Sequence, residues 1–221
     1  MNSALHGLYA ITPDQPPGAT AGDDLVLFSQ VAQAIAGGAR LIQYRVKGMD
    51  PQRRHAQAFA LATQCRQAAV PLIINDDMDL AQAVGAAGVH LGQDDGDPAT
   101  ARARLGPDAI IGVSCYDSLE LAQAAVRAGA DYCAFGSFFP STVKPEAVRP
   151  PIDLLTRARG QLDVPLVAIG GITPQNAGLL IAAGADMLAV ITGVFAAPDI
   201  AAAARAYSQL FEAGMRPTES T

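Results

Sequence analysis

The sequence predicts an α/β protein built as a single (β/α)8 barrel, the TIM barrel. Three observations predict it: a chain of 221 residues, short apolar segments alternating with helical stretches, and a glycine-containing turn that recurs before several of those segments. The length suits one domain with a full core and lies near the lower end for an eightfold barrel. We expect one catalytic domain over 1–214 and a polar tail over 215–221.

Eight segments are typical of strands buried on both faces of a parallel sheet, because several of them are continuous apolar runs. These segments lie at 8–12, 40–45, 71–75, 87–91, 110–114, 131–136, 165–169 and 187–191. The stretches between them are rich in Ala, Leu and Gln with helical spacing, as at 25–36, 51–69, 117–128 and 174–183. Strand and helix therefore alternate along the whole chain.

A weak internal repeat joins the helical stretches to the strands that follow. Glycine-containing tetrads occupy 37–40, 85–88, 128–131 and 183–186. Glycine readily adopts the left-handed conformation that ends a helix. One βα unit is therefore used repeatedly, and eight such units close into a barrel. The alternative is an open doubly wound sheet, but no GxGxxG motif follows the first strand.

The composition excludes several classes of protein. Half the residues are hydrophobic, 16% are charged and the net charge is −6, which fits a globular enzyme and argues against nucleic acid as a partner. The three cysteines are too widely spaced for a zinc site and indicate a reduced, cytoplasmic setting. We see no signal peptide and no run near the ~20 apolar residues that span a bilayer, so no membrane partner is expected.

Cationic residues mark one end of the predicted barrel, where the chemistry of such barrels takes place. The chain has thirteen Arg but only two Lys, Lys47 and Lys144, and both follow strand ends. Together with Arg45 they could neutralise a group resembling a di- or triphosphate. The alternative for any one of them is an ordinary solvated surface charge.

Acidic residues collect after the third and fourth strands, at Asp76, Asp77, Asp79, Asp94, Asp95 and Asp97. Adjacent strand ends would bring one carboxylate from each loop close to a hard cation. Magnesium commonly takes one or two carboxylates together with waters and substrate phosphates. Some of these acids have plainer roles: Asp77 or Asp79 is expected in the first turn of the next helix, where the helix dipole favours it.

Two glycine turns end the seventh and eighth strands, Gly170-Gly171-Ile172 and Ile191-Thr192-Gly193. This is the usual place for a phosphate bound by backbone N–H groups, although ordinary tight turns are the alternative. Thr173-Pro174 further suggests a helix N-cap with proline at the first helical position. A cationic, metal-assisted site beside an amide-lined site suggests transfer between two phosphorylated substrates.

The motifs LYAIT, QYRVK, PLIINDDMDLA, GVHLGQDD, IIGVS, ADYCAFGSFFPS–VKP, VAIGGI and AGADMLAVITGVF occur in this order. Through them the chain resembles the thiamine-phosphate synthase family from Tyr9 to about Phe211. The resemblance implies the same barrel and a transferase that needs Mg²⁺. It would join hydroxymethylpyrimidine diphosphate to the nitrogen of 4-methyl-5-(2-phosphoethyl)thiazole, or its carboxylated form, giving thiamine phosphate and pyrophosphate.

The resemblance also implies roles for individual residues. Those matched to substrate contacts are Gln43, Arg45, Lys47, Asn75, Ser114, Ser141, Thr142, Lys144, Gly171, Ile191 and Thr192. Asp76 and Asp95 match the magnesium ligands. One segment departs from the family's Thr-x-Thr-Lys pattern, because the chain has Ser141-Thr142-Val143-Lys144 and valine cannot hydrogen-bond a phosphate. Either Thr142 substitutes or one contact is lost.

Catalysis by stabilising the departing pyrophosphate would fall to Arg45, Lys47 and Lys144. We therefore expect Lys144→Ala to lose turnover while the fold is retained. The alternatives are an isomerase resembling thiazole tautomerase, which would not need the diphosphate-binding residues, and a non-catalytic phosphate-binding barrel. His90 is more consistent with packing at a strand end than with a catalytic base. The oligomeric state is left open, with a homo-oligomer allowed.

Overall fold

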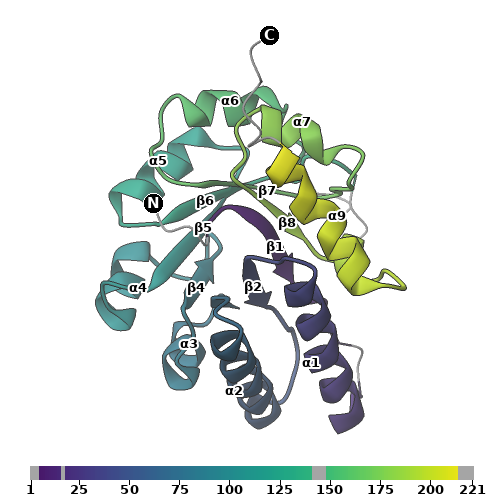
Figure 1. Cartoon of the computed structure of the whole chain (residues 1–221). Helices are drawn as coiled ribbons and strands as arrows, with labels where there is room; N and C mark the ends of the chain where they lie inside the picture. Colours follow the sequence, from purple (N-terminus) through teal and green to yellow (C-terminus); the bar gives the residue numbers. More distant parts are fainter. Residues whose placement is uncertain (1–4, 16–17, 141–147, 214–221) are drawn as a thin grey trace.

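The computed structural model describes residues 5–15, 18–140 and 148–213, and it confirms the predicted barrel. Eight parallel strands close in the order β1 to β8, with β8 returning to pair with β1 (Figure 1). The strands are β1 (Gly7–Ile11), β2 (Leu41–Tyr44), β3 (Leu72–Asn75), β4 (Gly88–Leu91), β5 (Ile110–Tyr116), β6 (Tyr132–Phe135), β7 (Leu166–Ile169) and β8 (Met187–Val190). Each overlaps one of the eight segments expected from the apolar pattern.

Helices surround the strands on the outside of the barrel (Figure 1). They are α1 (Ala21–Ala36), α2 (Pro51–Gln67), α3 (Met78–Val84), α4 (Pro98–Leu105), α5 (Leu119–Arg127), α6 (Asp153–Arg159), α7 (Ala177–Ala182), α8 (Thr192–Phe195) and α9 (Ile200–Ala213). Side-chain caps begin several of them. The carboxylate of Asp77, for example, accepts the N–H of Leu80 at 2.8 Å. Asp79 lies in the first turn of α3, as the sequence suggested for Asp77 or Asp79, whereas Asp77 and Asp97 are N-caps.

Two layers of core follow from the alternation of side chains along each strand. Every second residue points outward against the helices, as Leu8 and Ala10 do in β1. The intervening residues, such as Tyr9 and Ile11, point into the barrel and form a separate inner cluster. Polar residues that face inward are therefore held inside the barrel by the strands on which they lie.

The repeated turns share one structure at the N-terminal ends of the strands. Gly38, Gly85, Gly129 and Gly184 all have positive φ, as predicted for residues that end a helix. Before β8, the Asp186 carboxylate accepts the Leu166 N–H at 2.7 Å and pairs with an arginine of α6. Before β6, Asp131 accepts the Ile111 N–H at 2.7 Å and pairs with an arginine of α4. These two Asp–Arg clips join neighbouring strands and helices.

One local prediction is wrong. Helix α7 begins at Ala177, with Asn176 as the N-cap, so Thr173-Pro174 does not start it. The Asn176 side chain accepts the Thr173 N–H at 2.9 Å and donates to the Gly171 carbonyl at 3.1 Å. These two bonds fold 171–176 into a turn, which delays the helix. In the described ranges, no helix combines the length and apolar character needed to cross a bilayer.

Candidate active site

A cavity of about 710 Å³ opens at the C-terminal ends of the barrel strands. This volume is typical of small-molecule sites. The predicted residues that line it are Gln43, Arg45, Lys47, Asn75, Asp76, Asp95, Ser114, Gly171, Ile191 and Thr192. The predictions for Ser141, Thr142 and Lys144 fall outside the described residues. Within the described part of the chain, the structure therefore gathers every predicted site residue around one cavity.

The cationic segment after β2 is held by the loop that follows β1. The Thr12 hydroxyl accepts the Arg45 N–H at 2.9 Å and donates to the Arg45 carbonyl at 3.1 Å. Asp14 pairs with the Arg45 guanidinium at 2.6 Å and accepts the Lys47 N–H at 3.1 Å. The Arg45 side chain, 14% exposed, is thus fixed at the rim of the cavity by its pair with Asp14.

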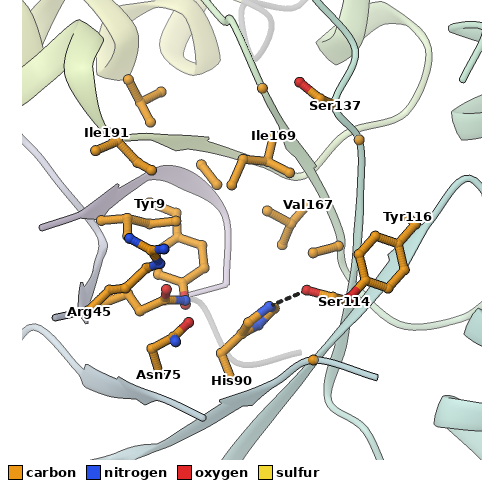
Figure 2. Close-up of a pocket in the computed structure, with 18 of the residues that line it drawn as sticks. Tyr9, Arg45, Asn75, His90, Ser114, Tyr116, Ser137, Val167, Ile169 and Ile191 are labelled. Atoms are coloured by element: carbon orange, nitrogen blue, oxygen red, sulfur yellow. Dashed lines mark hydrogen bonds between the residues drawn. The ribbon is translucent and has the colours of Figure 1, made fainter. Parts of the chain in front are cut away.

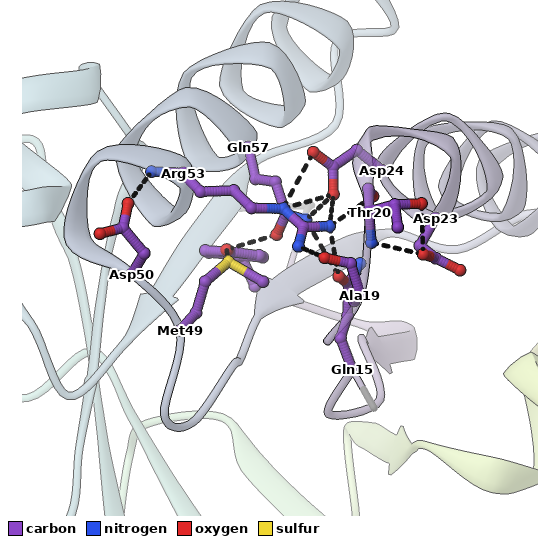
Figure 3. Close-up of polar contacts among 10 residues, drawn as sticks. Gln15, Ala19, Thr20, Asp23, Asp24, Met49, Asp50, Arg53 and Gln57 are labelled. Atoms are coloured by element: carbon purple, nitrogen blue, oxygen red, sulfur yellow. Dashed lines mark hydrogen bonds and ion pairs between the residues drawn. The ribbon is translucent and has the colours of Figure 1, made fainter. Parts of the chain in front are cut away.

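Side chains of helix α2 in turn bind the β1–α1 connection at Gln15, Ala19 and Thr20 (Figure 3). Arg53 donates to the carbonyls of Ala19 and Thr20 and pairs with Asp24 at the start of α1. Gln57 is buried and accepts the hydroxyl hydrogen of Tyr44 at 2.7 Å. This polar cluster ties together the β1–α1 connection, α1, α2 and β2, so the position of Arg45 depends on contacts remote from the cavity.

Asp76 and Asp95 approach each other across the adjacent ends of β3 and β4. Asp76 has φ of 66°, uncommon for a residue other than glycine, and its N–H donates to the His90 carbonyl at 2.8 Å. Asp95 accepts the Gly92 N–H at 2.9 Å. Burial, and then the adjacent Asp95 carboxyl group, raise the pKa of Asp76 from 3.8 to about 6, while Arg45 and Lys47 act in the opposite direction. Two ionised carboxylates here would repel each other.

This donor set fits a magnesium ion that is shared with the substrate. A divalent cation would offset the repulsion between the two carboxylates. In the described ranges, no cluster of three or more His, Cys, Asp or Glu side chains could hold a metal ion. Magnesium commonly completes its octahedron with waters and phosphate oxygens when a protein offers one or two carboxylates. Asp76 and Asp95 therefore suit a cation that arrives with a phosphorylated substrate.

The opposite side of the cavity is apolar (Figure 2). Val167 and Ile169 of β7 and Ile191 after β8 line it. Beside them Gly171 has φ of 60°, and an added Cβ there would lie 2.2 Å from the Pro140 carbonyl oxygen. Thr192 is the first residue of α8, where N–H groups lack acceptors inside the helix. The cavity thus combines a charged half with an apolar half that ends in backbone amides.

Sequence reasoning missed several residues of the site. Asp14 was not singled out, because nothing local links it to Arg45, which lies 31 positions further on. Tyr9 and Tyr132 occur in the strand motifs LYAIT and ADYCAFG, but no local signal shows that they meet inside the barrel. Inward-facing alternation along the strands was the signal that could have identified them. His90 is buried at a strand end, as expected, and bonds to Tyr132 and Ser114.

Fold and cavity together define a barrel with a small-molecule site at the mouth where barrel enzymes carry out their chemistry. The family model described as thiamine monophosphate synthase matches residues 8–194. The chain is 56% identical over 211 residues to thiamine-phosphate synthase of Azoarcus sp., covering 96% of this chain and all of that protein. It is 53% identical over 213 residues to that of Chromobacterium violaceum, again covering 96% and 100%. The chain belongs to the thiamine monophosphate synthase family.

A solved structure supports the same assignment. Thiamine phosphate pyrophosphorylase from Pyrococcus furiosus superposes with a TM-score of 0.82 at 31% sequence identity. The alignment covers 96% of this chain and 98% of that one. The likeness therefore extends over the whole barrel.

Proposed function

We propose that this chain transfers the hydroxymethylpyrimidine group from its diphosphate to the nitrogen of a thiazole phosphate, giving thiamine phosphate and pyrophosphate. Family membership and the near full-length identity to named synthases support the reaction. The observation that carries the residue roles is one cavity rim where Arg45 and Lys47 lie near the Asp76–Asp95 carboxylate pair.

The charged half of the cavity suits the pyrimidine diphosphate. Arg45 offers a planar fork of donors and Lys47 a compact charge, and together they would neutralise a departing pyrophosphate. Asn75 on β3 and Ser114 on β5, the strands on either side of β4, add uncharged hydrogen-bonding groups. Gln43 lies deeper, buried in β2, where it can contact the heterocycle. The family resemblance assigns Lys144 to the pyrophosphate of the same substrate, and Ser141 and Thr142 to a phosphate contact; these assignments stay predictions.

The apolar half suits the thiazole phosphate. Val167, Ile169 and Ile191 give a heterocycle an apolar surface. Backbone N–H groups at Gly171 and Thr192 lie beside that surface and would bind the phosphate. This arrangement would place the thiazole nitrogen toward the pyrimidine, because its phosphate is held at the far rim.

The chemistry asks the protein for charge stabilisation and alignment more than for proton transfer. The 4-amino group of the pyrimidine can push electrons toward the methylene carbon as the C–O bond to pyrophosphate breaks. The thiazole nitrogen then forms the new C–N bond. Magnesium held by Asp76 and Asp95 would supply positive charge to the leaving group. Arg45 and Lys47 would stabilise the same charge, and the apolar half would keep the acceptor in line.

The test is incubation of the protein with both heterocycles, with and without Mg²⁺, followed by the mass of the products. We expect thiamine phosphate and pyrophosphate only when both substrates and the metal are present. Conversion of the thiazole phosphate alone would instead identify an isomerase. Tight binding of the thiazole phosphate without any product would identify a non-catalytic barrel.

A further inference from the structure

Five side chains form a continuous hydrogen-bond chain inside the barrel, beneath the cavity. The Gln43 amide nitrogen donates to the Tyr9 hydroxyl at 2.6 Å, and the Tyr9 and Tyr132 hydroxyls are 2.8 Å apart. Tyr132 contacts His90 Nδ1 at 3.0 Å, and His90 Nε2 contacts the Ser114 hydroxyl at 2.9 Å. Gln43 and Ser114, the two ends of this hydrogen-bond chain, line the cavity, and Tyr9 and His90 also reach its wall.

The interior of the barrel is built around this chain. Tyr9 is 1% exposed and Tyr132 is fully buried. In the sheet Gly112 stands between its register partners His90 and Tyr132. A Cβ on Gly112 would lie 1.9 Å from the Tyr132 ring, so only glycine lets the ring cross over to His90. The His90 and Tyr132 rings stack with their centroids 5.7 Å apart. Figure 2 shows the hydrogen bond from the His90 ring to Ser114.

Counting hydrogens shows which group donates and which accepts at each step of the hydrogen-bond chain. The Tyr9 oxygen already accepts from Gln43, and its hydroxyl bonds only Gln43 and Tyr132 among the described residues. Its single hydrogen therefore goes to Tyr132, since a buried donor without an acceptor costs about 1–3 kcal/mol. Tyr132 must then give its own hydrogen to His90 Nδ1.

This direction selects one tautomer of His90. Nδ1 is the acceptor, so the ring hydrogen sits on Nε2 and is donated to the Ser114 oxygen. The Ser114 hydrogen is then left to point into the cavity. At the other end, the side-chain amide nitrogen of Gln43 faces Tyr9. The side-chain amide oxygen of Gln43 is therefore left for the cavity.

We propose that Tyr9, Tyr132 and His90 are positioning residues that hold Ser114 as a hydrogen-bond donor and Gln43 as an acceptor at the substrate. A donor at Ser114 suits an oxygen of the leaving diphosphate, and an acceptor at Gln43 suits an amino group on the pyrimidine. The reversed chain would turn Ser114 into an acceptor facing an anion. The identity of these ligands rests on the proposed function, whereas the direction of the chain does not.

The protonation of the two phenols agrees with this arrangement. Burial is the main cause that raises the pKa of Tyr9 and of Tyr132 well above the ordinary value of 10. Both hydroxyls therefore keep the hydrogens that the chain requires at the pH values where enzymes work.

The first test reads the tautomer directly in the full-length protein without substrate. Protein labelled with ¹⁵N-histidine is examined by long-range ¹H–¹⁵N correlation, which separates protonated from unprotonated ring nitrogens. The His90 signals are identified by their loss in His90→Gln, since His6 and His55 also contribute. We expect His90 with hydrogen on Nε2 alone. Hydrogen on Nδ1, or on both nitrogens near pH 7.5, would overturn the proposal even if the protein makes thiamine phosphate.

The second test uses substitutions within the hydrogen-bond chain and a matched control outside it. Tyr132→Phe removes the donor to Nδ1, so we expect a mixture of His90 tautomers and a kcat lower by about tenfold to a hundredfold, with a smaller change in KM. Tyr9→Phe should act in the same direction. Tyr207→Phe removes a buried hydroxyl that bonds the Ile172 carbonyl instead, and it should leave the His90 signals unchanged. Unchanged tautomer and kcat in a folded Tyr132→Phe protein would contradict the proposal.

If no thiamine phosphate forms with the wild-type protein, the proposed function fails while the tautomer still tests the chain. If product forms but His90 does not carry its hydrogen on Nε2 alone, only the proposed role of the hydrogen-bond chain fails. The two ideas are therefore judged by separate measurements on the same sample.

Discussion

Replacing Arg45 with methionine separates the catalytic role of its charge from any structural role. The Arg45–Asp14 pair is partly solvated, because the Asp14 side chain is 41% exposed. Ion pairs of this kind contribute about 0–1 kcal/mol to folding, and water can solvate the Asp14 carboxylate left behind. By contrast, losing one donor that stabilises charge in a transition state costs about 10²–10³ in rate, or about 2.7–4 kcal/mol.

We therefore expect Arg45→Met to lower kcat/KM for the diphosphate by about 10²–10³ while the free energy of unfolding changes by less than about 1 kcal/mol. Steady-state formation of thiamine phosphate and urea denaturation measure the two quantities. Arg104→Met is the matched control, because Arg104 also pairs with an aspartate, Asp79, but does not line the cavity. Near-normal kcat/KM in a folded Arg45→Met protein would refute the catalytic role of the Arg45 charge. A large loss of stability would refute the claim that this charge contributes little to folding.

Three further predictions concern the metal, the barrel interior and the clips. Asp95→Asn should raise the Mg²⁺ concentration for half-maximal activity by about tenfold or more, since one carboxylate is lost, as read from activity titrations. Gly112→Ala should lower unfolding stability in urea by about 1–3 kcal/mol, because the new Cβ meets the Tyr132 ring, whereas Gly178→Ala has open space and should not. Asp186→Ala should cost about 1–3 kcal/mol of thermal or chemical stability with kcat unchanged, because the Leu166 N–H loses its charged acceptor.

Much of this fold could be predicted because its signals are local. Buried parallel strands are apolar along their whole length, and each helix ends at a glycine or a short turn, so sequence order alone gives the eight units. The rim residues Arg45 and Asp76 could be located for the same reason, since each directly follows a strand. Once the barrel closes, strand ends meet at one mouth whatever the details of packing.

Contacts that depend on closure could not be predicted in this way. Tyr9 and Tyr132 lie 123 positions apart and meet only across the barrel interior. Asp14 reaches Arg45 because a polar cluster centred on Arg53 folds the intervening loop back. At Thr173-Pro174 the local signal was misleading, because the Asn176 side chain bonds Thr173 and Gly171 and forms a turn instead. Side-chain hydrogen bonds decided each of these cases, over 123 positions for Tyr9 and Tyr132 and over three and five positions for Asn176.

The Asp–Arg clips before β6 and β8 have a consequence for how such a protein can change. Asp131 and Asp186 anchor the base of the barrel, at the ends of the strands opposite the cavity. Substitutions around the mouth leave those anchors in place, so new substrate preferences could arise there without loss of the scaffold. The base would equally tolerate transplanted mouth loops from another barrel, which makes this chain a candidate host for grafted catalytic activity.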